Sequence, residues 1–321
     1  MRCCSHFVHS LGGEWAAGMP LALEHWPARY RGLASGLLQG GWYWGFILSA
    51  LTFHFVYPVF SEVSDPFSHS DSSTIAWRVM LWIGVIPALL VLWIRSGVSE
   101  SPVWLARQKQ LAHGGHRHGD GGGSLLRLFR GNLLATTIQT SLLMIVFMCS
   151  YYSITFWHPT FLLEFGRDPL GDLIAFNGGA IVGMAAWGRA SEGRLGRRGA
   201  VTLSALIDVA AVPLFLAGQN TGVLWLGALI MGGMGAGIWG MAPAYLTERF
   251  PTGVRGVGPG LSYHVGAAVG SLMRLVLGQL QDLGMTLTEA MQLSIVASGL
   301  TVALMIWLGP ETRGRALVGF N

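Results

Sequence analysis

A pattern of nine residues, E-x-x-P-x-x-x-R-G, occurs twice in this chain. It is found at residues 24–32 and again at residues 248–256. A second pair of short motifs agrees with it, because residues 99–101 (SES) follow one apolar stretch as residues 310–312 (PET) follow the last. Two sets of repeats in the same order indicate that the chain consists of two homologous halves.

Long apolar stretches surround both copies of the pattern. Hydrophobic residues make up 52% of the chain and charged residues 11%, a composition far from that of a soluble domain. A helix that crosses a bilayer needs about 20 apolar residues. The sequence therefore predicts an all-α polytopic membrane protein with nine spans, at residues 6–26, 33–57, 77–95, 133–157, 171–190, 199–218, 222–246, 257–278 and 287–309.

The basic residues follow the predicted membrane and do not form a surface for nucleic acid. The formal net charge is +4, but most of the 20 Lys and Arg lie in alternate loops, whereas the intervening loop 58–75 carries Glu62, Asp65 and Asp71. This pattern is typical of membrane proteins whose positive loops face the cytoplasm. We expect a multi-pass protein of the plasma (inner) membrane with a cytoplasmic C-terminus, whose partners are the lipid bilayer and small solutes and not nucleic acid.

Several phrases of the sequence resemble the major facilitator superfamily. They are the repeated E-x-x-P-x-x-x-R-G pattern, the ESPVWL phrase at residues 100–105, the Gly-Arg-Arg turn at residues 196–198 and the PET phrase. Within that superfamily, GGEWAAGMPLALEHWP, SYYSITFW, WGRASEGRLGRRGA and YLTERFPTGVRGVG are most similar to the proton-coupled sialate and lactate carriers.

The resemblance implies a fold of twelve helices in two six-helix halves. Within the second half, three predicted spans precede the one that ends in its copy of the pattern, whereas none precedes the corresponding span of the first half, so the first three of the twelve helices are expected to be missing. The expected domains are an incomplete N-terminal half at 1–96, a cytoplasmic Gly/His-rich linker at 97–131 and a complete six-helix half at 132–321. His113, His116 and His118 in the linker lack the framed spacing of a zinc site, so we expect a solvated linker, no metal and no cofactor.

The repeated pattern predicts a conformational gate. A carboxylate at the end of a helix, followed by Pro and then Arg-Gly, ends one helix and starts the next. Glu24 is expected to pair with Arg31 or with a basic residue elsewhere on that face, as a salt bridge that holds one packing of the halves without touching substrate. By resemblance, Glu192 stands in for an acid that the superfamily places in the adjacent loop. The candidate gating residues are Glu24, Arg31, Glu192, Arg194, Arg197, Arg198, Glu248 and Arg255.

Polar and ionisable residues inside the spans are candidates for the path of substrate and proton, since such residues usually face a cavity. Glu14 fits a proton relay and equally fits a cap at the outer interface. Arg274 fits the binding of a substrate carboxylate or a chance change, and Asp208 is expected to have a packing role. The other candidates are Gln39, Gln139, Tyr152, Asn177, Tyr263 and His264, beside Trp42, Trp44, Tyr151, Trp157 and Trp239, and each also fits a contact between helices.

These features predict a secondary transporter and not an enzyme. The sequence lacks a phosphate loop, a Cys-x-x-Cys pair and a Gly-x-Ser-x-Gly elbow. By resemblance, the substrate is a small organic anion, a monocarboxylate or sugar acid such as lactate or sialate, which moves with a proton by alternating access. The alternative is a truncated remnant that does not transport, or a membrane interaction protein.

Overall fold

The computed structural model describes residues 15, 18–64, 74–97, 125–217, 220–315 and 317. The predicted all-α architecture is confirmed, because the regular elements of these residues are helices, beside one isolated bridge between Ser64 and Thr74. Residues 18–24 are helical. The other helices are α2 (Arg31–Phe60), α3 (Ala76–Gly97), α6 (Asn132–Thr155), α7 (His158–Glu164), α8 (Leu170–Ala190), α9 (Gly196–Phe215), α10 (Thr221–Met231), α11 (Ala242–Arg249), α12 (Val257–Gly270), α13 (Met273–Asp282) and α14 (Leu287–Met305), with short turns η1 (Ala28–Tyr30), η2 (Gly232–Ala236), η3 (Gly237–Gly240), η4 (Thr252–Val254) and η5 (Ile306–Leu308).

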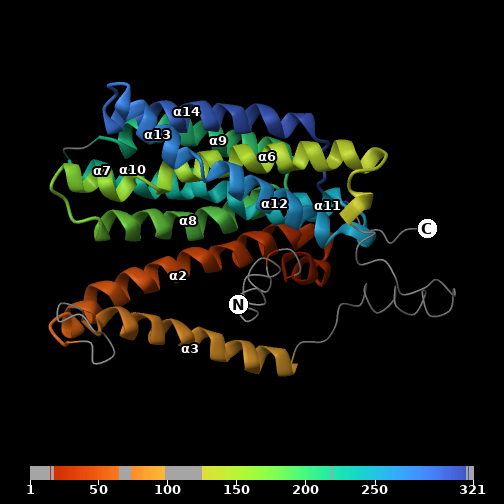
Figure 1. The fold of residues 1–321 in the computed structure, drawn as a ribbon. Coiled ribbons are helices and arrows are strands. Elements are labelled where there is room, and N and C mark those ends of the chain that lie inside the picture. The colour runs from red at the N-terminus through yellow and green to blue at the C-terminus, as the bar shows by residue number, and fades with distance from the viewer. Residues whose placement is uncertain are drawn as a thin grey trace.

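The helices from α6 to α14 form one bundle, and α2 and α3 lie along one side of it (Figure 1). Within the bundle α6 packs on α12 and α14, and α9 packs on α10 and α14. Helix α2 packs on α8, while α3 packs on α2, on the side away from the bundle. Helix α2 therefore joins the bundle mainly through α8, with further contacts to η3 and α11.

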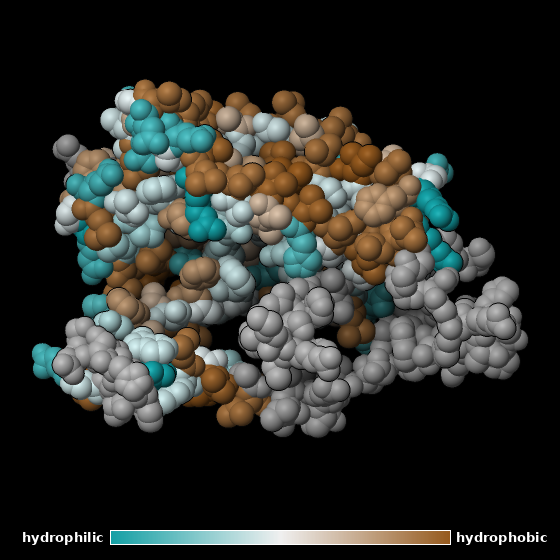
Figure 2. Space-filling view, in the orientation of Figure 1, coloured by the Kyte–Doolittle hydropathy of each residue, from teal (hydrophilic) through white to brown (hydrophobic). Residues whose placement is uncertain are grey.

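Six of the described helical segments are long and apolar enough to cross a bilayer. They are Ala28–Phe60, Asn132–Glu164, Leu170–Ala190, Gly196–Phe215, Thr221–Arg249 and Leu287–Leu308. Figure 2 shows hydrophobic side chains along the flank of the bundle and hydrophilic ones gathered toward its two ends, as expected for helices that span lipid. These six segments match predicted spans, α3 matches the span at 77–95, and most of the span at 6–26 lies outside the described residues.

The predicted continuous span at 257–278 is wrong, because the structure breaks it into α12 and α13. The break at Ser271 and Leu272 follows Gly270, and the Ser271 hydroxyl donates a hydrogen bond to the Ala268 carbonyl at 2.7 Å. Glycine is a poor helix former, and a serine that bonds to its own helix competes with the regular hydrogen bonds. Arg274, which the sequence suggested would lie deep in this span, is exposed near the start of α13.

The segment from Thr221 to Arg249 is helical throughout but irregular in the middle. Helix α10 widens into the π-helical turn η2, tightens into the 3-10 turn η3 and continues as α11. Four of the nine residues in η2 and η3 have side chains, since their sequence is GGMGAGIWG. Such an insertion into an α-helix is often found at functional sites.

Glycines allow the backbones of α2 and α8 to meet. A Cβ atom at Gly36 of α2 would overlap the Met184 carbonyl of α8, and one at Gly188 of α8 would overlap the Gly32 carbonyl of α2. On the bundle side of α8, Gly183 is equally close to Gly233 of η2. Small residues at such positions are the usual means of close helix packing in lipid, and here they place α2 and η2 against the same helix.

This contact predicts that Gly36→Ala destabilises the protein by about 1–3 kcal/mol, because the methyl group meets backbone that has no free rotamer to change. Gly41→Ala is the matched control. Gly41 lies on the same helix with no atom within 4 Å of a Cβ position, so the change is expected to be neutral or to stabilise the helix by up to about 1 kcal/mol. Thermal unfolding in detergent measures both, and equal midpoints would contradict the proposed contact.

Candidate functional site

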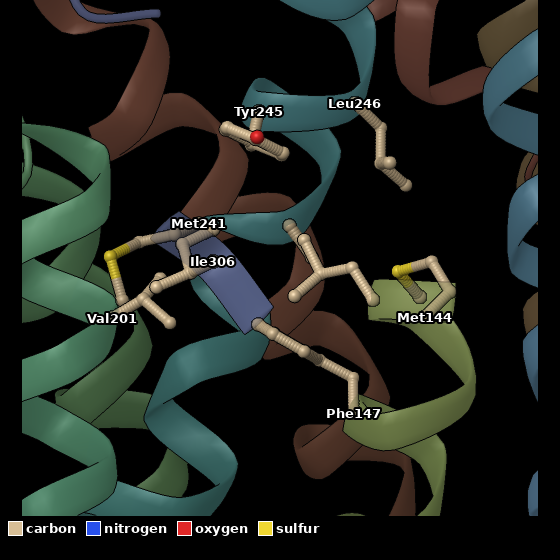
Figure 3. A pocket seen from close by; sticks show the side chains of 9 residues that line it. Met144, Phe147, Val201, Met241, Tyr245, Leu246 and Ile306 are labelled. Carbon is tan, nitrogen blue, oxygen red and sulfur yellow. The ribbon is translucent and has the colours of Figure 1, made fainter. Parts of the chain in front are cut away.

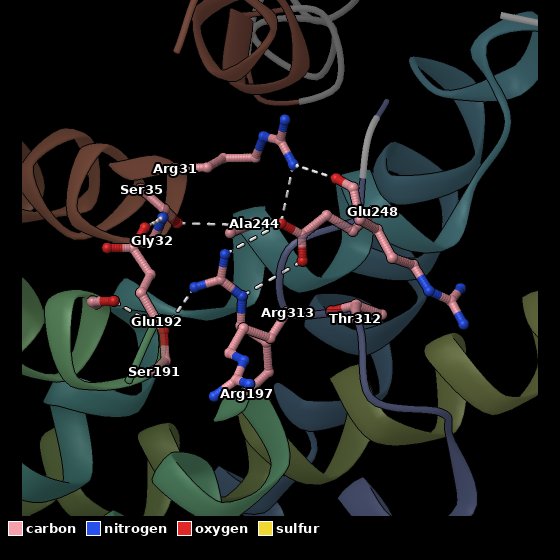
Figure 4. Close-up of polar contacts among 12 residues, drawn as sticks. Arg31, Gly32, Ser35, Ser191, Glu192, Arg197, Ala244, Glu248, Thr312 and Arg313 are labelled. Atoms are coloured by element: carbon pink, nitrogen blue, oxygen red, sulfur yellow. Dashed lines mark hydrogen bonds and ion pairs between the residues drawn. The ribbon is translucent and has the colours of Figure 1, made fainter. Parts of the chain in front are cut away.

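The two copies of the repeated pattern pair crosswise. Arg255 Nη1 of the second copy lies 2.8 Å from Glu24 Oε1 of the first. Arg31 Nη1 of the first copy lies 3.1 Å from Glu248 Oε1 of the second (Figure 4). Each pair joins residues more than 200 positions apart. Of the two pairings that the sequence allowed for Glu24, the structure shows the one with a basic residue elsewhere on the face.

Glu248 also binds a second arginine, Arg197 at the start of α9. Arg197 Nη2 lies 3.0 Å from Glu248 Oε1, and its Nε donates to Oε2 at 3.3 Å. The side chains of Arg197 and Glu248 are fully buried, and that of Arg31 is 4% exposed. A carboxylate that accepts from two guanidinium groups forms strong charge-assisted bonds, so Glu248 joins α2, α9 and α11 at one point.

Glu192 adds a second carboxylate between α8 and α9. Its Oε1 accepts a hydrogen bond from the Gly32 backbone N–H at 2.5 Å, and its Oε2 lies 3.8 Å from Arg189 Nη1. Burial raises the pKa of Glu192, against the opposing effects of the Gly32 amide and of the Arg197 charge. The expectation that Glu192 replaces an acid of the superfamily motif stays a prediction, and its hydrogen bond to Gly32 joins the loop between α8 and α9 to the start of α2.

Glu311 of the PET phrase caps the N-terminus of helix α9, although it lies 114 positions after Arg197 in the sequence. Its carboxylate accepts hydrogen bonds from the backbone N–H groups of Arg197 at 2.9 Å, Arg198 at 3.1 Å and Arg313 at 2.8 Å. The first two belong to the start of α9, where unpaired amides and the helix dipole favour an anion. Burial opposes the charge of Glu311, but these amides hold its pKa below its ordinary value.

The remaining two gating candidates differ in their surroundings. The Arg198 guanidinium lies 4.1 Å from the centre of the Trp307 ring and donates to the Trp307 carbonyl at 3.4 Å. Arg194 is exposed. Arg198 therefore fastens the start of α9 to the end of the last helix, whereas Arg194 lies at the surface.

An aromatic cluster lies where α2 and the first described residue meet the bundle. Trp15 stacks on Tyr263 of α12 at 4.2 Å, and Tyr263 lies 6.3 Å from Trp239 of η3. Trp239 in turn contacts Phe147 at 5.6 Å and Tyr151 at 5.8 Å, both on α6. Rings at these separations attract one another through their edges and faces. The cluster therefore gathers five aromatic rings in one place, with Trp15, Phe147 and Trp239 buried in it.

A hydrogen bond extends this cluster to α2, and a ring contact extends it along α6. Trp42 Nε1 donates to the Tyr151 hydroxyl at 3.3 Å, and the ring of Tyr152 lies 5.5 Å from that of Tyr151. Tyr43, the neighbour of Trp42, is buried and its ring lies 6.4 Å from that of Phe176 on α8. Sequence reasoning missed Tyr43 and Phe147; the WYW triplet at 42–44 was a signal for the former.

The structure brings only some of the candidate residues for the substrate and proton path close to one another. Tyr152 and Tyr263 belong to the aromatic cluster, and His264 is exposed beside Tyr263, 5.4 Å from its ring. Gln39 is half-buried on α2, and Glu14 lies outside the described residues.

Three further candidates lie apart from the cluster. Asn177 is buried and donates to the Leu173 carbonyl of its own helix at 2.6 Å. Gln139 accepts from Arg249 at 3.1 Å, near the end of α11. The Arg274 guanidinium lies 4.4 Å from the centre of the Phe156 ring. Arg249 was not among the predicted residues, although it directly follows Glu248.

A cavity inside the bundle is too small to be the site of a substrate. It has a volume of about 10 Å³ and is lined by apolar side chains such as Phe147, Met241 and Leu246 (Figure 3). Such a volume holds about one water molecule. It is a packing void between α6, α9 and α11. Among the described residues, His, Cys, Asp and Glu side chains form no group of three or more that could hold a metal ion.

Comparison with known proteins finds relatives along nearly the whole chain. Residues 6–273 match the Major Facilitator Superfamily. A probable 4-methylmuconolactone transporter of Cupriavidus pinatubonensis is 30% identical over 314 residues, which are 95% of this chain and 68% of that protein. The sialic acid transporter NanX of Escherichia coli is 27% identical, over 84% of this chain and 62% of the relative.

Other matches agree with these. The cis,cis-muconate transport protein of Acinetobacter baylyi is 26% identical, over 85% of this chain and 63% of its own length. Among solved structures, the proton:xylose symporter XylE has a TM-score of 0.70 at 20% identity, over 93% of this chain and 68% of that chain. The relatives are transporters and not enzymes, and this chain spans roughly two thirds of their length.

The crosswise pairing predicts the outcome of a charge exchange. Glu24→Arg and Arg255→Glu are each expected to destabilise the protein by about 3–5 kcal/mol, since each leaves a buried charge unpaired. The double variant is expected to recover at least half of that loss. Thermal unfolding tests this, with Arg194→Ala as an exposed control within about 0.5 kcal/mol of the parent. Recovery by Glu24→Arg with Arg31→Glu instead would place the pair inside one repeat.

The Glu311 cap on α9 predicts that the stability of the protein depends on pH. The folded-state pKa of Glu311 lies below its unfolded value of about 4.3. Its stabilisation is therefore present above that value and is lost as the pH falls through the folded pKa. We expect Glu311→Gln to lower the unfolding midpoint at neutral pH and the gap to the parent to close in acid. A gap that is constant with pH would contradict this.

Proposed function

The chain belongs to the major facilitator superfamily, and we propose that it is a secondary transporter that carries small organic acids together with protons by alternating access. The observation that carries the proposal is the crosswise pairing of the repeated motifs. A protein whose halves rock against each other needs bonds between the halves that form at one end in one state and break in the other. Glu24–Arg255 and Arg31–Glu248 are bonds of this kind.

These ion pairs act as a gate because they are buried. Separating the halves at this end exposes Arg31, Glu248 and Arg197 to water, which replaces their mutual bonds by hydration. Breaking a buried ion pair without replacing it costs about 3–5 kcal/mol, so the gate stays closed until water or substrate enters. The free energy of substrate and proton binding in the other state must offset this difference.

The substrate class is proposed from two observations. The relatives are named for 4-methylmuconolactone, cis,cis-muconate and sialic acid, which are acids or the lactone of one. In this chain Trp15, Trp239 and Tyr263 form an aromatic cluster beside α2, and Trp15 and Trp239 are buried while the gate is closed. Ring faces bind flat, unsaturated parts of a small molecule, and the polar tips of Trp42 and Tyr151 are suited to a carboxylate or hydroxyl.

Proton coupling fits this chemistry, because a proton neutralises one carboxyl charge before the loaded site changes sides. Glu14 is the proposed relay from the sequence. The protein is proposed to lie in the cytoplasmic membrane with its C-terminus inside, on the distribution of its basic loops. In this orientation the ion network between the repeats closes the cytoplasmic side, since it contains the start of α9 and the loop before α12.

The proposal predicts saturable uptake of a labelled small carboxylate, such as cis,cis-muconate or sialic acid, into proteoliposomes, driven by an inward proton gradient and abolished by a protonophore. Tyr263→Ala is expected to raise KM about 3- to 10-fold, since an aromatic contact contributes about 0.5–1.5 kcal/mol. Trp82→Ala, at a 57% exposed position on α3, is the control and should leave KM unchanged. Folded protein with no saturable flux of any such acid would favour a membrane interaction protein.

A further inference from the structure

Asp208 is a buried carboxylic acid that neither the gate nor the aromatic cluster uses. It lies in the middle of α9 and has no exposed surface. Neither of its carboxyl oxygens has a hydrogen-bond partner in the described part of the chain. An unpaired carboxylate in the interior of a membrane protein is costly, and such residues usually have a function.

The carboxyl group faces the π-helical turn η2. A Cβ atom at Gly235 of η2 would overlap Asp208 Oδ1, so only glycine leaves room for the carboxyl there. Gly299 of α14 borders the other oxygen, since its Cβ position lies 3.7 Å from Oδ2. One turn before Asp208, the Ser204 hydroxyl donates to the Met234 carbonyl of η2 at 2.7 Å. The acid is therefore enclosed by glycine backbone at the irregular part of the α10–α11 segment.

No basic group neutralises Asp208. The elements packed on α9 are α8, α10, α14, η2, η3 and η5, while Ile154 of α6 also borders Gly235 and His158 of α7 stacks on Phe215 at the end of α9. Helix α10, η2, η3 and η5 carry no titratable side chain. Those on the other elements are Asp172 and Arg189 (α8), Glu289 (α14), Cys149, Tyr151 and Tyr152 (α6), His158 and Glu164 (α7), and Arg197 and Arg198 (α9).

None of these side chains bonds to Asp208. The two arginines on its own helix are at the far end, since eleven residues of helix from Arg197 span about 16 Å. With no counter-charge and no donor, the ionised form is strongly disfavoured in this packing. A metal cation would need several oxygen ligands at once, whereas a proton needs only the carboxyl itself, so the geometry selects the proton.

The same two segments carry the gate. Arg197 and Asp208 are on α9, and Glu248 and Gly235 are on the segment from Thr221 to Arg249. Helix α9 is therefore held against this segment at one end by the ion pair of Arg197 with Glu248 of α11 and in the middle by the contact of Asp208 with η2. A movement that separates the ion pair also loosens the glycine turn and lets water reach the carboxyl.

We propose that Asp208 is a proton-binding site of this protein, which holds a proton while the gate is closed and releases it when α9 and η2 separate. The proposal rests on the proposed function only in giving the bound proton a role in transport. The binding itself concerns the protein alone. In the step, the O–H bond of the Asp208 carboxyl breaks, the proton passes to water, and the carboxylate that remains is hydrated.

Infrared difference spectroscopy of the full chain in lipid tests the binding without substrate. The spectrum of the parent minus that of Asp208→Asn is expected to show the carbonyl band of a protonated carboxyl at neutral pH, where an ordinary aspartate, with a pKa of about 3.9, is ionised. Asp282→Asn, an exposed acid at the end of α13, is the matched control and should show no such band. Absence of the band for Asp208 in folded protein overturns the proposal.

A second variant tests the link to the gate. Glu248→Gln weakens the ion pair with Arg197, and we expect the Asp208 band to disappear at a proton concentration at least tenfold higher than in the parent. Asp282→Asn should leave the titration unchanged. An unaltered titration in Glu248→Gln overturns the link between proton release and gate opening.

Transport then separates this inference from the proposed function. The Asp208→Asn variant is expected to exchange labelled acid across the membrane as the parent does. Its proton-driven accumulation of that acid is expected to fall at least tenfold. Full proton-driven accumulation in this variant overturns the role in coupling. If the parent itself transports nothing while the infrared band is present, the proposed function fails and the proton site stands.

Discussion

The carboxylate of Glu248 is the point on which the arrangement of the described helices depends. It accepts bonds from Arg31 at the start of α2 and from Arg197 at the start of α9, while it belongs to α11. Three segments distant in sequence meet there in a setting with little water, where such bonds are strong and an unpaired charge is costly. Together with Glu24–Arg255, it makes the contact between the two copies of the pattern specific, because each acid has a defined arginine partner in the other copy.

The close backbone contacts serve the same arrangement. Gly36 of α2 and Gly183 of α8 bring three segments of chain to distances that side chains would prevent. Because lipid offers little hydrophobic drive for helices to associate, these contacts and the buried ions supply the specificity. The π-helical turn η2 contacts α8 on one side and the buried carboxyl of Asp208 on another.

Prediction from sequence succeeded where the signal was local and failed where partners were distant. Apolar length predicted most of the helices within a few residues, and the repeated pattern identified Glu24, Arg31, Glu248 and Arg255 as a set. The pattern left open which of these acids binds which arginine, since the pairing depends on how the two copies face each other. The break after Gly270 was missed because mean hydropathy does not register helix continuity, and the lack of hydrogen-bond partners at Asp208 could not be seen in the sequence.

Apolar length and repeated motifs are properties of contiguous residues, so they were enough to predict helices, a membrane setting and two related halves. The crosswise ion pairs, the aromatic cluster around Trp239 and Tyr263, and the contact of Asp208 with Gly235 became visible only in the packed helices. These depend on distances between residues that are far apart along the chain. The packing of the helices sets those distances, and with them which charges are neutralised and which acid is left to bind a proton.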